Sequence, residues 1–166
     1  ALLAIMIYIW FRFEWQFSIA AVIALGHDVI STVGLFALAS FEFNLATVAA
    51  ILTIAGYSIN DTVVVFDRVR ENLRKYKSWD QAKILNKSLN ETLSRTVMTS
   101  VTTSLALLAI IIFGGAVLRD FALAMLWGVT VGTYSSIFVA VGVISRFDLK
   151  RSDDEDNSAP VPEYER

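Results

Sequence analysis

The chain alternates between long apolar stretches and short polar ones. Four apolar stretches, at 18–40, 45–66, 96–113 and 121–144, are each close to the ~20 residues with which an α-helix crosses a bilayer. Because an isolated strand in lipid leaves its backbone unpaired, these stretches are expected to be helices. A fifth run, at 1–11, has about half that length, and we interpret it as the second half of a helix in a fragment of a longer protein. The pattern predicts an all-α polytopic membrane protein, a bundle of about five transmembrane helices with the first one truncated.

A polar region separates the second and third complete spans. Within 78–94, leucines recur at helical spacing among lysines and asparagines, which predicts an amphipathic helix on the membrane surface or against the bundle. Ser78 and Gln81 have the spacing of a capping box at its start. The end of the chain, 148–166, is acidic and polar, and we expect it to be solvated and disordered. The predicted organisation is thus a membrane domain at 1–147 followed by a tail.

The basic residues orient the predicted spans. Lysine and arginine gather in the turn at 12–16, in the loop between Arg68 and Lys87, and in the tail. The turn at 41–44 has none, and the turn at 114–120 has only Arg119. Because basic loops stay on the cytoplasmic side, the tail is expected to be cytoplasmic.

Composition narrows the function classes. Apolar residues make up 55% of the 166 residues, above the roughly 45–50% of soluble domains. The chain has no cysteine and one histidine, so thiol chemistry is excluded and neither a metal nor a cofactor site is expected. The net charge of −2 gives no support for nucleic-acid binding. The expected surroundings are a lipid bilayer and partner proteins, and no covalent catalysis is expected.

Asp61 is the acid that stands out in the second complete span, with Asn60 beside it. A carboxylate in the middle of a membrane helix costs roughly 2.5–3.5 kcal/mol, so an ionisable residue there indicates function. It could carry a proton, since burial favours its neutral form and a nearby cation its charged form. It could instead belong to a static ion pair, or reach the interface, although aspartate is short for that.

Arg95 begins the third complete span, on a helical face that also carries Thr99. By itself Arg95 is an interfacial residue that can extend to the headgroups. Its depth matches that of Asp61, so the two could pair across adjacent helices. The hydroxyl-rich face beside it could line a hydrated path, or its hydroxyls could bond back to their own helix.

Two further features lie inside the predicted spans. His27 and Asp28 form a polar pair near the middle of the first complete span, and we consider them secondary candidates for proton coupling. Gly128 and Gly132 have the spacing of a small-residue stripe, which predicts close helix packing.

Several motifs resemble one bacterial protein-export family, SecF. They are GYSINDTVVVFDRVREN at 56–72, LGHDV at 25–29, RFEW at 12–15 and SRTVMTSVTT at 94–103. The family's order and spacing of these motifs is kept up to about Phe147, whereas the acidic tail carries no resemblance. The related SecD subunit has a similar motif, but the residues at 56–61 match SecF better.

The resemblance implies a fold and a function. Members pair with SecD to form a twelve-helix membrane domain similar to that of the resistance-nodulation-division (RND) transporters, and this chain would be part of one half of it. The complex works beside the SecYEG channel in the inner membrane. They use the proton-motive force to help draw preproteins out on the periplasmic side. Carried over by motif, the proton-pathway acid falls on Asp61 and the essential arginine on Arg95, and the partner acid belongs to SecD. The first helix and the periplasmic domain of the family are not in this stretch of sequence.

Other interpretations remain open on the sequence. A scaffold subunit would use Asp61 and Arg95 as a structural pair that assembles a complex. An RND-type exporter of small molecules or lipids would have the same kind of membrane domain. The coupling ion could be Na⁺ in place of H⁺.

Overall fold

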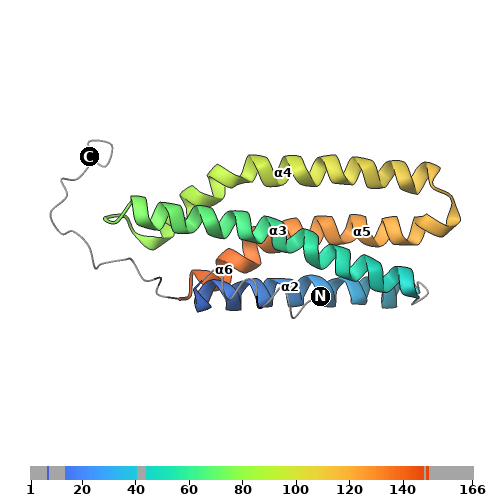
Figure 1. The fold of residues 1–166 in the computed structure, drawn as a ribbon, viewed down its shortest axis with the longest axis horizontal. Helices are drawn as coiled ribbons and strands as arrows, with labels where there is room; N and C mark the ends of the chain where they lie inside the picture. The colour runs from blue at the N-terminus through green and yellow to red at the C-terminus, as the bar shows by residue number, and fades with distance from the viewer. Residues whose placement is uncertain (1–6, 8–13, 41–43, 148, 150–166) are drawn as a thin grey trace.

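The computed structural model describes residue 7 and residues 14–40, 44–147 and 149. Within them the chain is helical and contains no strand. The helices are α2 (Trp15–Ala39), α3 (Leu45–Lys75), α4 (Gln81–Phe113), α5 (Ala116–Tyr134), the π-helical turn η1 (Ser135–Val139) and α6 (Ala140–Ile144). The last three follow one another without a break, and α6 lies at an angle to α5 (Figure 1).

The helices form an elongated bundle in which α3 occupies the centre (Figure 1). It contacts α2, α4 and α5, while α4 and α5 run side by side as a hairpin. Four helices are long and apolar enough to cross a membrane: Trp15–Ala39, Leu45–Lys75, Gln81–Phe113 and Leu118–Ile144. This confirms the predicted all-helical membrane fold. Most of the predicted truncated helix at 1–11, the turn at 41–43 and nearly all of the tail lie outside the described residues.

Two helices extend beyond the predicted spans. The structure has one continuous helix, α4, where the sequence pattern suggested an amphipathic segment at 78–94 and a separate span at 96–113. Likewise α3 continues past residue 66 to Lys75. The polar end of α3 and the start of α4 pack through Val69, Leu73 and Ile84, and this shared apolar contact stabilises both helices in their polar parts.

The helix starts show a second difference. The predicted capping box at Ser78 is wrong, because α4 is capped by Asp80, whose side chain accepts a hydrogen bond from the backbone of Ala82. A capping box occurs instead at α3, where Asn44 accepts from the backbone of Thr47 and the Thr47 side chain accepts from the backbone of Asn44. These caps satisfy backbone donors that a helix start leaves unpaired.

The contact between α3 and α5 depends on two glycines. A Cβ on Gly128 would lie 2.3 Å from the Ile54 side chain, and one on Gly132 would lie 3.1 Å from the Cβ of Ser58. Ile54 is buried, so it has little room to move away. The two glycines therefore let α5 approach α3 more closely than any residue with a side chain would.

We expect Gly128→Ala to destabilise the protein by about 1–3 kcal/mol, the usual effect of overpacking a close contact. Gly142→Ala is the matched control, because a Cβ there meets nothing within 4 Å. Thermal unfolding in detergent measures both. Equal melting temperatures for the two variants would contradict the close packing at Gly128.

Candidate functional site

Asp61 lies in the middle of α3 and its side chain is buried, with 3% of the residue exposed. Its Oδ2 atom has no hydrogen-bond partner within the described part of the chain. The hydroxyls of Tyr57, one turn earlier on α3, and of Thr96, on α4, are buried without partners as well. Buried polar atoms in native proteins are nearly always hydrogen-bonded, so Asp61 differs from Ser58, Thr62 and Asn72, which are buried polar residues of α3 that have partners.

Arg95 supplies the positive charge that acts on Asp61 from α4. It is exposed, and no ion pair of the described residues joins its guanidinium directly to the carboxylate. The two predicted residues thus come to the same region of the α3–α4 contact without a salt bridge.

A polar cleft of about 330 Å³ extends from this region along the two helices. It is lined by Val64, Asp67, Arg68, Glu71, Glu91, Thr92 and Arg95. On α3, the lining residues Val64, Arg68 and Glu71 follow Asp61 at helical spacing, so the cleft lies along the face that carries Asp61. Asp61 is not among its lining residues, and the nearest of them on α3 is Val64, three residues further along the chain.

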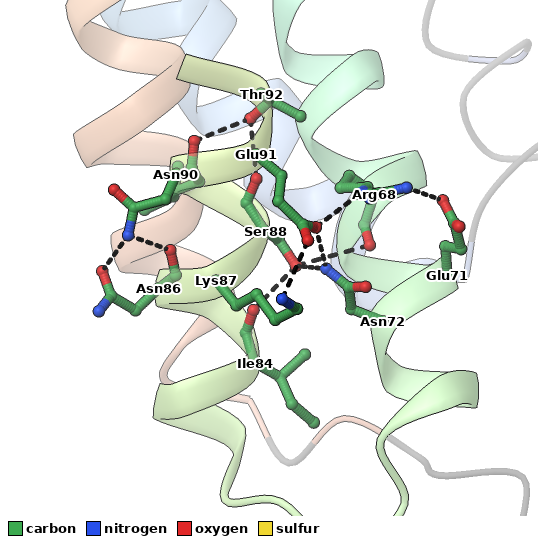
Figure 2. Close-up of polar contacts among 11 residues, drawn as sticks. Arg68, Glu71, Asn72, Ile84, Asn86, Lys87, Ser88, Asn90, Glu91 and Thr92 are labelled. Carbon is green, nitrogen blue, oxygen red and sulfur yellow. Dashed lines mark hydrogen bonds and ion pairs between the residues drawn. The ribbon is translucent and has the colours of Figure 1, made fainter. Parts of the chain in front are cut away.

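Glu91 connects the residues that line this cleft on α3 and α4 (Figure 2). Arg68 Nε donates to its Oε2 atom at 2.7 Å, Asn72 Nδ2 donates to the same atom at 2.8 Å, and Lys87 Nζ lies 3.1 Å from Oε1. Arg68 also donates to Glu71, which fixes the guanidinium between two carboxylates. The cluster therefore joins α3 to α4 at their polar ends.

Glu91 precedes Arg95 in the polar part of α4, before the apolar stretch 96–113 that the sequence predicts to cross the bilayer. The hydrogen bonds from Arg68 and then Asn72 lower the pKa of Glu91 from 4.5 to about 2. Glu91 is therefore ionised at any physiological pH and cannot carry a proton. It lines the cleft and joins α4 to α3 there.

We expect the Glu91 cluster to make stability depend on pH. Because the folded pKa lies below the unfolded value of 4.5, its stabilisation is complete above that pH and is lost as the pH falls towards about 2. Glu91→Gln should therefore lower the melting temperature at neutral pH and have little effect near the folded pKa. Glu71→Gln, whose side chain is 60% exposed, is the control with a smaller effect. A Glu91→Gln difference that does not change with pH would contradict this account.

The placement of Thr99 and Asn60 gives less support to a polar path beside Asp61 than the sequence suggested. Thr99 donates its hydroxyl to the backbone oxygen of Thr96 at 2.9 Å, and Thr102 donates to that of Met98 at 2.9 Å. This is the back-bonding alternative for the hydroxyl face. Asn60 is exposed on α3, next to Asp61 but turned away from the buried site.

The secondary candidates His27 and Asp28 form a separate polar site. Asp28 is completely buried, and its Oδ1 atom lies 3.0 Å from His27 Nδ1. The Ser135 hydroxyl donates to Oδ2 at 2.7 Å, and the Ser58 hydroxyl donates to the same atom. This carboxyl group therefore connects α2 with α3 and with the π-helical turn.

Sequence reasoning missed the partners of Asp28. Ser135 and Ser136 are both fully buried and hydrogen-bonded to other helices. Ser136 lies 2.9 Å from the Thr62 hydroxyl of α3. Two adjacent hydroxyls in an apolar span were the available signal, but most such hydroxyls bond back to their own helix.

The chain was compared with known proteins. Residues 1–150 match the family "Protein export membrane protein SecD/SecF, C-terminal". The protein translocase subunit SecF of Rhodobacter capsulatus is 59% identical over 152 residues, which cover 92% of this chain and 46% of that protein. SecF of Rickettsia rickettsii is 53% identical over 145 residues, covering 87% and 47%. The chain thus spans about half the length of these curated relatives.

Two solved structures have the same fold. One is SecDF in its super-membrane-facing form, with 50% identity and a TM-score of 0.82, and the other is SecDF of Thermus thermophilus, a translocon-associated membrane protein, with 51% identity and a TM-score of 0.82. In each case the match covers 86% of this chain and 20% of the other. The motif resemblance is confirmed, and the chain belongs to the SecD/SecF family of protein-export membrane proteins.

Proposed function

We propose that the chain is the membrane-embedded, energy-converting part of a SecF-type subunit, which uses the proton-motive force to help move preproteins across the bacterial inner membrane. The observation that carries the proposal is the state of Asp61. Its carboxyl group is buried at the centre of the bundle, one oxygen has no partner in the described residues, and the charge of Arg95 acts on it from the next helix. These are the properties of a proton carrier in a transporter.

In the proposed cycle, Asp61 takes up a proton from a path open to the outside. Neutralisation weakens its attraction to Arg95, the α3–α4 contact shifts, and the proton leaves inward along the polar cleft. Asn60 and Thr99 stay candidates for the proton path of the assembled complex, although Asn60 is turned away from Asp61 and the Thr99 hydroxyl bonds to its own helix. The two states differ by one buried charge, which biases a two-state bundle by a few kcal/mol. No covalent step is involved.

The uncovered face of α4 supports a partner inside the membrane. Only 11% of its apolar window is buried in the described bundle, against 39–44% for the other three candidate spans. The proposed partner on this face is SecD, whose acid completes the site beside Asp61 and Arg95. Both solved relatives are SecDF chains. The bilayer surrounds the remaining apolar surface, and SecYEG and a preprotein on the periplasmic side complete the proposed assembly.

The same open face favours a second candidate, a scaffold subunit in which Asp61 and Arg95 only assemble the complex. The two functions can be distinguished by removing the cell's own subunit and supplying the full-length protein in its place. Vesicles from cells depleted of their own subunit receive the full-length protein, and release of an exported protein is measured with and without an imposed proton-motive force. The proposal expects the force-dependent part of release to return. Normal co-purification with SecD and no force-dependent release would support the scaffold.

A further inference from the structure

Asp28 is a buried titratable group that the cycle around Asp61 does not use. Its side chain is 0% exposed, and its contacts come from three elements: His27 on α2, Ser58 on α3 and Ser135 on η1. Burying an unpaired carboxylate is costly, so this set of contacts decides whether the group is charged. Among the described residues, His27 is the titratable group in contact with it, and α3 and η1 present hydroxyls.

The polar atoms around Asp28 have hydrogen-bond partners in both protonation states. Ser58 and Ser135 each have one hydroxyl hydrogen, and Oδ2 accepts both when the carboxyl group is ionised. Ser135 Oγ also lies 3.1 Å from the backbone oxygen of Gly132. When Oδ1 carries the proton, it donates to His27 Nδ1, and Oδ2 becomes a neutral and therefore weaker acceptor. The Ser135 hydrogen then turns to the backbone oxygen of Gly132, which breaks the contact between Ser135 and Asp28. The site thus accepts a proton without leaving a buried donor unpaired.

His27 connects this buried group to the outside of the bundle. Its side chain is 42% exposed, while Nδ1 lies 3.0 Å from Oδ1 of Asp28. A proton can pass from the imidazolium to the carboxylate, as the N–H bond at Nδ1 breaks and an O–H bond forms at Oδ1. The reverse step returns the proton, and histidine is the residue suited to such a relay near neutral pH.

The π-helical turn is the element that responds to this change. In an α-helix adjacent residues point about 100° apart, yet Ser135 and Ser136 are both fully buried. Ser135 reaches Asp28 on α2, and Ser136 reaches Thr62 on α3. The extra residue of the π-helical turn lets both contacts form, and such turns often mark functional sites in helices.

We propose that His27 and Asp28 form a second proton-binding site, in which protonation of Asp28 releases the π-helical turn of the last span from α2. The proposal rests on the proposed function, to which it adds a second proton-binding site. Ser58 lies three residues before Asp61 on α3, so the two sites share one segment of that helix. Release of Ser135 at one site therefore alters the packing beside the other.

The first test titrates the full-length protein in its complex by infrared spectroscopy, in an Asp61→Asn background. That background removes the Asp61 signal, so the result does not depend on whether Asp61 is the coupling residue. We expect a protonated-carboxyl band that grows on acidification, disappears in Asp28→Asn and shifts in Ser135→Ala. Ser145→Ala, in an exposed turn, should leave the band unchanged. A titration spectrum that keeps every band in Asp28→Asn would overturn the second site.

The second test follows the π-helical turn itself. Spin labels on the exposed residues Ile30 of α2 and Phe138 of η1 report the distance between the two elements, with other cysteines of the full-length chain replaced. Asp28→Asn mimics the protonated group, so its distance distribution should match that of the unsubstituted protein at low pH. Where Asp28→Asn fails to assemble, Ser135→Ala makes the same comparison. A distribution that pH and Ser135→Ala both leave unchanged would refute the release of the turn.

Discussion

Replacing Asp61 by asparagine should abolish force-dependent release of an exported protein while leaving the complex assembled. Asparagine has almost the same shape as aspartate, so the packing of α3 against α4 is preserved, but the side chain cannot exchange a proton. A buried charge is worth roughly 2.5–3.5 kcal/mol, so its permanent loss shifts the equilibrium between the two bundle states by about 100-fold. The measurement is release from vesicles with and without an imposed proton-motive force, with co-purification of SecD as the check on assembly.

The matched control is Asp120→Asn. Asp120 is an exposed acid near the start of α5, far along the chain from the α3–α4 contact, and its substitution removes the same charge. We expect the control to retain full force-dependent release. If Asp61→Asn also retained force-dependent release, Asp61 would be a structural residue. If the complex fell apart in Asp61→Asn and not in the control, the result would support the scaffold function.

Arg95→Gln should produce the second large effect, for a related reason. Arg95 provides the positive charge that favours the ionised form of Asp61 and lies at the edge of the polar cleft. Without it the carboxyl group keeps its proton, and the inward release step stops. We expect force-dependent release to fall by at least about 10-fold, the change that corresponds to 1.4 kcal/mol.

The variant Arg95→Lys separates charge from shape. Lysine keeps the positive charge but lacks the planar donor set, so partial activity is expected. Arg119→Gln, an exposed arginine at the other end of α4 and α5, serves as the control and should behave as the unsubstituted protein. Equal loss in Arg95→Lys and Arg95→Gln would mean that the guanidinium geometry matters more than its charge.

The helical membrane fold could be predicted because hydropathy and length decide it. In lipid the backbone must be paired within each segment, which leaves helices as the outcome for long apolar runs. The continuity of α4 could not be read in the same way. Its start is amphipathic and its end apolar, and the pattern changes near Arg95 although the helix does not. Whether a helix continues through such a change depends on the tertiary contacts of Ile84 with α3.

The candidate site, like the fold, could be predicted only in part. Asp61 could be located because a carboxylate in an apolar run is conspicuous, and the motif at 94–103 indicated Arg95. The environment of Asp28 could not be predicted, because Ser135 is 107 residues away and reaches it through the π-helical turn. The missing partners of Asp61, Tyr57 and Thr96 are likewise properties of the packed structure, since only burial shows that an atom is unsatisfied.

The most direct measurement is proton entry into sealed vesicles that contain the full-length protein with SecD. A pH-sensitive dye inside the vesicles reports acidification after a proton gradient is imposed. The account predicts rapid acidification with the unsubstituted protein and with Asp120→Asn, and none above the leak of empty vesicles with Asp61→Asn. Acidification at the full rate with Asp61→Asn would contradict the claim that Asp61 carries the proton.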